Sequence, residues 1–234
     1  MNLTSISSTS YSTYLHCPYC WKLKYIDKLL IPDNENFIIG KALHTALENY
    51  HKAVSDDYTI NYLKKIFLTE PIDNKKIDNF SVVKKMYELY KKYPLGGKTK
   101  SLEYEFRISL PRINATLHGF MDRVTKEGEI IDYKTTARDY TTEVANNVQA
   151  EIYSFALKDM GSKTAKVIFY IINKKKVKKA GYIPQVITLE PDTSKLIDKL
   201  VVFYNNVRDN KFAPIKGHNC NFCLFKEYCK HYKK

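Results

Sequence analysis

The sequence lacks any long hydrophobic run. Its longest apolar stretch, Val167–Ile172, is far shorter than the roughly 20 residues that a membrane-spanning helix needs. The first ten residues also lack the basic start and apolar core of a signal peptide, and neither a low-complexity segment nor an internal repeat is found. We therefore expect an intracellular, cytoplasmic protein that does not enter a membrane.

Cysteine is scarce, with 5 among 234 residues. Disulfides are rare in reducing compartments, so these residues are expected to bind metal or to remain thiols. Two of them form Cys17-x₂-Cys20 and two form Cys220-x₂-Cys223, which together make a regular four-cysteine zinc layout. That layout leaves Cys229 unused.

Acidic residues are also in short supply, with 25 Asp and Glu against 38 Lys and Arg, a formal net charge of +13. Such an excess attracts polyanions, nucleic acid first and an anionic membrane surface second, although lysine can also serve solubility alone. The 19 tyrosines and 11 phenylalanines are interleaved with lysine, a combination suited to stacking on the bases of a single strand. A Walker A loop is absent, so unwinding of a duplex would need a partner.

The chain is organised around Gly119–Lys134. Two apolar-rich segments, His118–Thr125 and Glu129–Thr135, flank a Lys-Glu-Gly turn and predict a β-hairpin. Each segment carries one acid, Asp122 in the first and Asp132 in the second.

Alternation along a strand places Asp132 and Lys134 on the same face. An aspartate among Ile130, Ile131 and Tyr133 would be buried, and an unpaired buried charge is costly. A divalent cation between Asp122 and Asp132 would remove that cost and leave Lys134 available for chemistry. The alternative is a surface hairpin with ordinary salt bridges.

Hydrophobic periodicity predicts an α/β fold. A helix at Phe37–Lys52 is followed by a strand with Leu102, Tyr104, Phe106, Ile108 and Leu110 on one face, and then by the hairpin. A helix at Thr142–Asp159 and a buried strand at Lys166–Ile172 complete the order αβββαβ, a mixed sheet flanked by helices.

The remaining segments are expected to surround this core in one domain. Two short helices within Ser5–Leu30 are predicted to break at Cys17-Pro18, and the loop at Pro94–Gly97 is expected to be a flexible joint. Further helices are predicted at Ile60–Leu68, Phe80–Tyr93 and Thr193–Asn210, with an edge strand at Tyr182–Leu189. The parts are an N-terminal helical segment (1–36), a core (37–175) with a helical insertion (about 58–95), and a tail region (176–234).

Five short motifs in register carry a family resemblance. They are Gly40-Lys-Ala-Leu-His44, Glu103-x-Glu105, Gly119-Phe-Met-Asp122, Asp132-Tyr-Lys134 and Gln149-Ala-Glu-Ile-Tyr153. Their order and spacing resemble the PD-(D/E)xK nucleases of the RecB type. The pattern is most similar to the iron–sulfur branch, which includes AddB-type nucleases and CRISPR-associated adaptation exonucleases. Met121 stands where the family name has proline, as is common in that branch.

The resemblance implies a restriction-endonuclease-like core and a role for each motif. It implies metal coordination by the side chains of His44, Asp122 and Asp132 and by the Tyr133 carbonyl. It implies catalysis by Lys134, with Gln149 and Tyr153 as the signature pair, and Glu103 (or Glu105) as the partner acid. Oxygen-rich ligands suit Mg²⁺ or Mn²⁺. Taken alone, His44 could be a surface histidine beside Glu48, Gln149 an exposed polar residue and Tyr153 a half-buried one.

The resemblance also implies a [4Fe–4S] cluster held by Cys17, Cys220, Cys223 and Cys229, since four thiolates are its usual protein ligands. Cys20 would then be an apolar neighbour, whereas the zinc layout would make it a ligand. In either arrangement the cysteines form a C-terminal clasp that joins the two ends of the chain.

The predicted function is a metal-dependent DNA nuclease, an exonuclease acting on single-stranded DNA or DNA ends. Its setting would be recombination, repair, phage replication or CRISPR adaptation, with a helicase or a CRISPR adaptation protein as a possible partner. The alternatives are a catalytically weak DNA-binding module with structural zinc, and an RNA-directed nuclease.

Overall fold

The computed structural model describes residues 3–31, 35–69, 74–137, 147–217, 220–221 and 223–232. The chain forms two compact units. The first unit comprises Met1–Pro32, Glu105–Gly119 and Asp192–Lys234, and the second comprises Asp33–Tyr104 and Phe120–Pro191. The start of the helix expected at Thr142–Asp159 lies outside the described residues.

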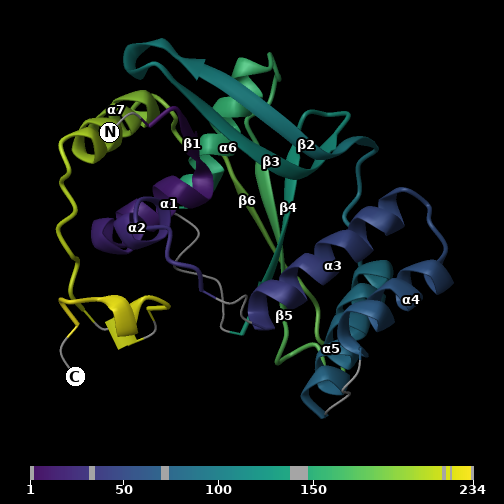
Figure 1. Cartoon of the computed structure of the whole chain (residues 1–234). Helices are drawn as coiled ribbons and strands as arrows, with labels where there is room; N and C mark the ends of the chain where they lie inside the picture. The colour runs from purple at the N-terminus through teal and green to yellow at the C-terminus, as the bar shows by residue number, and fades with distance from the viewer. Residues whose placement is uncertain are drawn as a thin grey trace. The chain divides into compact units, whose positions relative to one another are not determined.

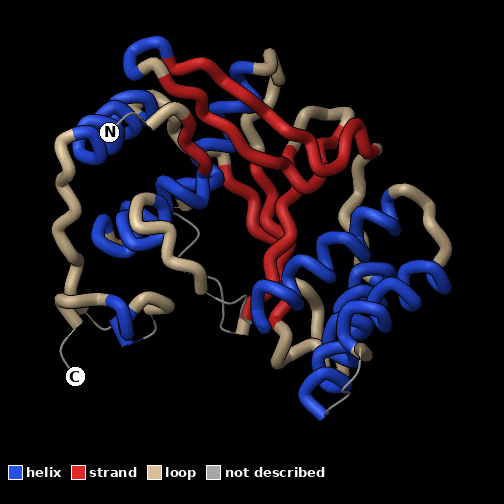
Figure 2. The backbone as a smooth tube through the Cα atoms, in the orientation of Figure 1, coloured by secondary structure: helices blue, strands red, loops and turns tan. Residues whose placement is uncertain are grey.

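The second unit is built on a mixed sheet (Figure 2). Its strands are the end of β3 (Ala115–Thr125), β4 (Ile130–Thr136), β5 (Val167–Asn173) and β6 (Gln185–Leu189). β4 is antiparallel to β3, with Arg123 opposite Ile131, and it is parallel to β5 along its whole length. β6 pairs antiparallel with β5 and begins directly after Pro184, because proline cannot donate a ladder hydrogen bond.

The predicted hairpin is confirmed. The Thr125 N–H donates to the Glu129 carbonyl over 2.9 Å, and Gly128 takes a φ of 85° in the turn. That left-handed conformation is open to glycine at little cost.

Helices cover both faces of this sheet. α3 (Glu35–His51), α4 (Asp56–Phe67) and α5 (Asn74–Lys92) pack together beside it (Figure 1). Ile131 and Tyr133 share a buried cluster with these helices. The alternate residue Lys134 contacts Gln149 of α6 (Val148–Asp159), so α6 lies on the opposite face. With α4 and α5 inserted after α3, the order α3, β2 (Thr99–Leu110), β3, β4, α6 and β5 confirms the predicted αβββαβ core.

Two of these helices begin with a side-chain cap that the sequence supplies. The Ser55 hydroxyl accepts the Tyr58 N–H at the start of α4, and the Asn147 side chain accepts the N–H groups of Gln149 and Ala150 at the start of α6. Such caps satisfy backbone donors that the first turn leaves without partners. The cap at Asn147 fixes where α6 starts, and Gln149 lies in its first turn.

The first unit contains α1 (Ser8–His16), α2 (Pro18–Tyr25) and α7 (Leu196–Arg208). The break between α1 and α2 at Cys17-Pro18 is as predicted, because proline disfavours helical conformation in the residue before it. Trp21 is the centre of this unit, where its ring stacks on Phe212 with 5.8 Å between ring centroids. A short strand, β1 (Ser5–Ser7), pairs in parallel with Thr116–His118; at three residues it was too short to show alternation in the sequence.

One predicted strand face is partly wrong. β2 (Thr99–Leu110) buries Phe106, Ile108 and Leu110 as expected, but Tyr104 is exposed. The cause is the intervening residue Glu103, whose φ of 46° is left-handed and interrupts the alternation. A non-glycine residue in that region carries a backbone cost of about 1–3 kcal/mol and is often found at a functional site.

The loop expected to be a flexible joint is fixed by Arg123. This arginine is buried and donates to the carbonyls of Leu95, Gly96 and Gly97 and to the hydroxyl of Thr99. A buried guanidinium needs such acceptors. Within the described part of the chain, no helix has both the length and the hydropathy needed to cross a bilayer.

Candidate active site and cysteine cluster

The hairpin places two acids close to the same backbone segment. Asp122 lies near the end of β3, and its Oδ2 accepts the Tyr133 N–H over 2.8 Å. Asp132, on β4, is 1% exposed, and its Oδ2 lies 2.7 Å from Lys134 Nζ. The predicted shared face of Asp132 and Lys134 is therefore present, and the buried carboxylate has a cationic neighbour.

His44 reaches this backbone segment from α3. Its Nε2 lies 2.8 Å from the Tyr133 carbonyl oxygen, and its Nδ1 lies 3.3 Å from Asp122 Oδ1. Ligand atoms of His44, Glu103 and Asp122 all lie within 4.8 Å of one another. The left-handed backbone of Glu103 thus occurs at a residue of this group.

The structure distinguishes the two acids of the Glu103-x-Glu105 motif. Glu103 joins His44 and Asp122, whereas the Glu105 carboxylate lies 2.5 Å from Arg107 on the same strand. Glu103 is therefore the acid that is positioned to act with Asp122.

A chain of hydrogen bonds leads from Lys134 to α6 and back to β3. The Lys134 ammonium donates to Gln149 Oε1 over 2.7 Å, and Gln149 Nε2 donates to the Tyr153 hydroxyl over 2.8 Å. That hydroxyl donates to the Phe120 carbonyl over 2.6 Å. Gln149 and Tyr153, one helical turn apart, together fix the direction of the Lys134 side chain.

Burial and neighbouring charges shift the pKa values of His44 and of the three acids of the site. Burial raises the pKa of Asp132, and the negative charge of Asp122 raises it further. The positive charge of Lys134 acts in the opposite direction but does not cancel these effects. Burial, again reinforced by Asp122, raises the pKa of Glu103. Burial alone would lower the pKa of His44, but the charge and hydrogen bond of Asp122 raise it to about 9. Burial acts against ionisation of Asp122 too, yet His44 and the Tyr133 N–H hold its pKa below the usual value.

These residues fit a divalent cation. Three acids and one histidine converge here, and the charge of Asp122 opposes ionisation of both Asp132 and Glu103, so an added positive charge would be stabilising. Carboxylate and carbonyl oxygens are the ligands that Mg²⁺ prefers. In this structure His44 Nε2 is hydrogen-bonded to the Tyr133 carbonyl oxygen over 2.8 Å. His44 would have to lose its proton to coordinate, so binding would be coupled to pH.

Two residues that hold the Tyr133 side chain, His51 and Tyr90, were not predicted from the sequence. The Tyr133 hydroxyl lies 3.0 Å from His51 Nε2 and 3.0 Å from the Tyr90 hydroxyl. His51 comes from the end of α3 and Tyr90 from α5. The sequence contained only a faint sign of this, namely that His51 shares a helix face with His44 and Glu48.

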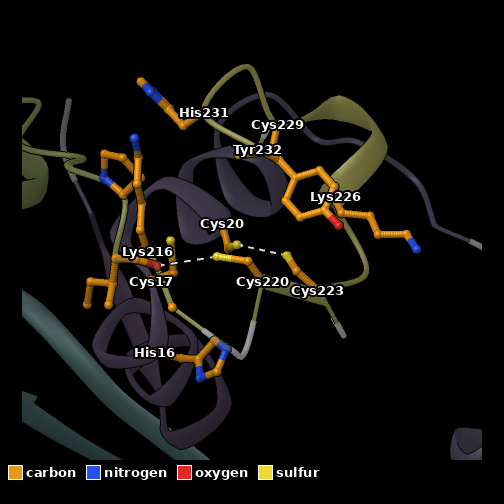
Figure 3. A pocket seen from close by; sticks show the side chains of 13 residues that line it. His16, Cys17, Cys20, Lys216, Cys220, Cys223, Lys226, Cys229, His231 and Tyr232 are labelled. Carbon is orange, nitrogen blue, oxygen red and sulfur yellow. Dashed lines mark hydrogen bonds between the residues drawn. The ribbon is translucent and has the colours of Figure 1, made fainter. Parts of the chain in front are cut away.

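The five cysteines gather in the first unit (Figure 3). Cys17 and Cys20 come from the start of α2, and Cys220, Cys223 and Cys229 come from the C-terminal tail. All five line one cavity of about 140 Å³, roughly ten times the room that a single water requires.

Within this cavity the sulfur atoms of Cys20 and Cys223 lie 3.2 Å apart. Burial raises the pKa of the Cys20 thiol, and the neighbouring Cys223 and Cys17 raise it further. A metal cation beside these sulfur atoms would stabilise the thiolate form that binds metal. The cavity thus brings together the ligands of both the cluster and the zinc arrangements.

Comparisons with known proteins agree with the fold. A profile of the PD-(D/E)XK nuclease superfamily matches residues 5–230. A crystal structure of a "putative exonuclease" from Eubacterium rectale aligns with a TM-score of 0.62 and 12% identity, over 98% of this chain and 90% of that one. The protein SSO0001 aligns over 100% of this chain and 90% of that one, with 13% identity and a TM-score of 0.49. No curated protein sequence matches.

The family match extends across both units and includes all five motifs of the candidate site. The order of strands and helices and the mixed sheet agree with the same family. The chain belongs to the PD-(D/E)XK nuclease superfamily.

Proposed function

We propose that this chain is a metal-dependent deoxyribonuclease of the RecB type and that it acts as an exonuclease on single-stranded DNA or DNA ends. One observation carries the proposal: Lys134 is fixed by Asp132 and Gln149 next to a cluster of His44, Glu103 and Asp122. An ammonium beside grouped acids suits hydrolysis of a phosphodiester, where negative charge develops near a divalent cation.

The residues divide into two roles. His44, Asp122, Asp132 and the Tyr133 carbonyl would hold Mg²⁺ or Mn²⁺, with Glu103 as a further acid beside them. When bound, such an ion polarises the phosphodiester and lowers the pKa of the attacking water. Lys134 orients that water and offsets charge on the phosphate. Gln149 and Tyr153 keep the ammonium in place, so that little reorganisation is needed during the reaction.

For the cysteine cavity we propose a [4Fe–4S] cluster held by Cys17, Cys220, Cys223 and Cys229, as in the iron–sulfur branch of the family. The room in the cavity and the position of Cys229 on its wall support a centre larger than one ion. The short distance between Cys20 and Cys223 instead favours the zinc alternative, because zinc draws four sulfurs in to about 2.3 Å from the ion. An intracellular setting suits either centre, since five reduced thiols persist there.

The partner would be DNA, attracted by the net charge of +13. A helicase or a CRISPR adaptation protein would supply the strand, because the sequence has no Walker A loop of its own. Recombination, repair, phage replication and CRISPR adaptation all generate single strands or free ends of this kind.

The test is cleavage of labelled oligonucleotides by the purified protein. Single-stranded and duplex DNA, each with a blocked 5′ or 3′ end, would be incubated with Mg²⁺, with Mn²⁺ or with a chelator. The proposal expects metal-dependent loss of single-stranded DNA that one blocked end prevents. Cleavage that ignores both blocks would replace exonuclease with endonuclease action, and faster cleavage of RNA of the same sequence would replace DNA as the substrate. DNA binding without any cleavage would contradict the proposal.

A further inference from the structure

A groove extends from the candidate metal site along the outside of α3. It has a volume of about 570 Å³ and is lined by His44, Glu103, Glu48 and Thr45 at one end and by Lys41, Gly40, Phe37 and Asn36 at the other. His44 and Glu103 belong to the site already described. The Asn36 end of the groove has no role in the chemistry proposed above.

The wall of this groove follows from helical spacing. Phe37, Lys41, His44 and Glu48 recur at steps of four, three and four, so they share one face of α3. At a rise of about 1.5 Å per residue, Phe37 lies roughly 10 Å along the helix from His44. That distance equals about three steps of a stacked nucleic-acid strand, each about 3.4 Å long.

The two ends of the groove differ in character. Glu103 and Glu48 lie near the metal site, where bound cations would offset their charge, and Glu48 is also paired with Lys52 at 2.6 Å. At the other end Lys41 is exposed and Phe37 is 55% exposed. The Lys174 ammonium donates to the Asn36 side chain there, and it begins a run in which Lys174, Lys175, Lys176, Lys178 and Lys179 follow β5.

An exposed phenylalanine beside lysines is suited to binding a nucleic-acid strand. The ring offers a face on which any base can stack, and the ammonium groups pair with phosphates. Bases in a duplex already stack on one another and are closed to such contact, whereas bases of a single strand are open to it. The groove therefore combines stacking with charge and leads to the atoms that would hold the scissile phosphate.

We propose that this groove binds the single strand next to the cleaved bond, with Phe37 stacking on a base within about three nucleotides of it and Lys41 pairing with a phosphate. The inference rests on the proposed nuclease function and adds the residues that select a single strand over a duplex. Phe37 and Lys41 bind substrate and take no part in the chemical step.

Binding without cleavage isolates this proposal. Anisotropy of a labelled oligodeoxythymidine would be measured in chelator for wild type, Phe37→Ala, Phe37→Trp and Tyr58→Ala. Tyr58 is the matched control because it is an exposed aromatic of α4, 63% exposed. Phe37→Ala should weaken single-strand binding about 5- to 100-fold, with duplex binding unchanged, while Phe37→Trp and Tyr58→Ala stay within a few-fold of wild type.

A scan with one abasic nucleotide identifies the stacked base. Wild type should lose affinity when the abasic nucleotide lies at one particular position of the strand. For Phe37→Ala, the affinity should not depend on the position of the abasic nucleotide. Lys41→Ala should reduce the dependence of log affinity on log salt by about 0.7, the value for one phosphate on a single strand. Lys64→Ala, an exposed lysine of α4, should leave that slope unchanged.

The outcomes separate this inference from the function on which it rests. Suppose that wild type cleaves single-stranded DNA, but Phe37→Ala has the same affinity and the same abasic-scan profile as Tyr58→Ala. The groove is then not the strand site, and the nuclease proposal stands. If wild type neither binds nor cleaves single-stranded DNA, both proposals fail.

Discussion

Lys134 is restrained from two sides, by the Asp132 carboxylate and by the Gln149 amide oxygen, each 2.7 Å from its ammonium. Lys134→Ala should lower kcat for single-stranded DNA about 100-fold or more, because it removes charge stabilisation that is already in position. Affinity should stay within a few-fold, since binding depends on many surface lysines. Steady-state kinetics and anisotropy would measure both. Lys166→Ala, a lysine that pairs with Glu129 at 3.8 Å, is the control; wild-type kcat in Lys134→Ala would remove this lysine from the mechanism.

In the proposed mechanism Gln149 acts on the reaction only through Lys134, to which it is hydrogen-bonded. Gln149→Ala should therefore cost less, about 10- to 100-fold in kcat as for other residues that orient an active group, and KM should change little. Since Gln149 also bonds to Tyr153 over 2.8 Å, Tyr153→Phe should produce a smaller loss in the same direction. A larger loss in Tyr153→Phe than in Lys134→Ala would assign the tyrosine a direct role.

Gly119, the first residue of the motif before Asp122, is required for packing. A Cβ at this position would lie 2.8 Å from Phe106 Cε1 and 2.9 Å from Cζ, in a ring that is itself buried. Gly119→Ala should lower the free energy of unfolding by about 1–3 kcal/mol, the usual cost of overpacking. Urea unfolding would measure it. Gly96→Ala, where nothing lies within 4 Å, is the matched control, and Phe106→Leu in the same chain should recover part of the loss.

At the scale of elements, α3 and α5 are joined to β4 through His51. Burial, with a smaller contribution from Arg123, lowers the pKa of His51 to about 4, whereas an unfolded histidine titrates near 6.5. The native state keeps His51 neutral, with its Nε2 2.7 Å from the Tyr90 hydroxyl and 3.0 Å from that of Tyr133. Between these two pKa values the unfolded chain binds the extra proton, so the stability that His51 provides is present above pH 6.5 and is lost as pH falls toward 4.

His51→Gln should remove this dependence while keeping a group that can hydrogen-bond to both hydroxyls. In chelator, the thermal midpoint of wild type should therefore fall more steeply between pH 6.5 and 4 than that of the variant. Other acids contribute equally to both proteins, so the difference between the two curves reports His51 alone. Parallel curves would mean that His51 titrates normally in the folded protein.

The elements were predictable where a periodic pattern was long or a turn was explicit. The β3–β4 hairpin, the helix α3 and the edge position of β6 follow from alternation, helical spacing and Pro184. Three features were not predictable. β1 is too short to show a pattern, Glu103 adopts a left-handed φ that propensity does not favour, and Arg123 is buried only because three carbonyls of a distant loop accept from it.

The same contrast applies to the site. Alternation alone predicted that Asp132 and Lys134 share a face, and the resemblance supplied Gln149 and Tyr153. The support of Tyr133 by His51 and Tyr90 could not be predicted, because it depends on how α5 packs against α3 rather than on spacing within one element. The resemblance favoured Glu103 over Glu105, but the sequence did not reveal the left-handed backbone at Glu103.

At the scale of the whole molecule, cysteines that are far apart in the sequence lie around one cavity. Cys17 precedes every element of the second unit, and Cys220, Cys223 and Cys229 follow all of them, yet all four line one cavity. A centre bound by these residues closes a loop of about 200 residues, which restrains the unfolded chain by roughly 4–5 kcal/mol on the chain-entropy scale for cross-links. That is comparable with the total stability of many domains. Loss of the centre should therefore destabilise the whole protein.

Two single substitutions distinguish the cluster from zinc. With a [4Fe–4S] cluster on Cys17, Cys220, Cys223 and Cys229, Cys229→Ala should bleach the brown colour, lower the thermal midpoint and weaken cleavage indirectly. Cys20→Ala should do none of these, because Cys20 would be only an apolar neighbour. With zinc on Cys17, Cys20, Cys220 and Cys223, the protein should be colourless, Cys20→Ala should lower the midpoint, and Cys229→Ala should have no effect.

The 3.2 Å between the sulfurs of Cys20 and Cys223 makes Cys20 the more informative variant. Deleting a buried thiol that binds nothing leaves only a small cavity, whereas deleting a metal ligand leaves the centre incomplete and releases the long loop. Anaerobic purification, a visible spectrum and iron and zinc analysis of both variants would give the identity of the centre, and thermal unfolding would give its effect on stability. Iron in wild type together with loss of iron in Cys20→Ala would contradict both arrangements and make Cys20 a cluster ligand.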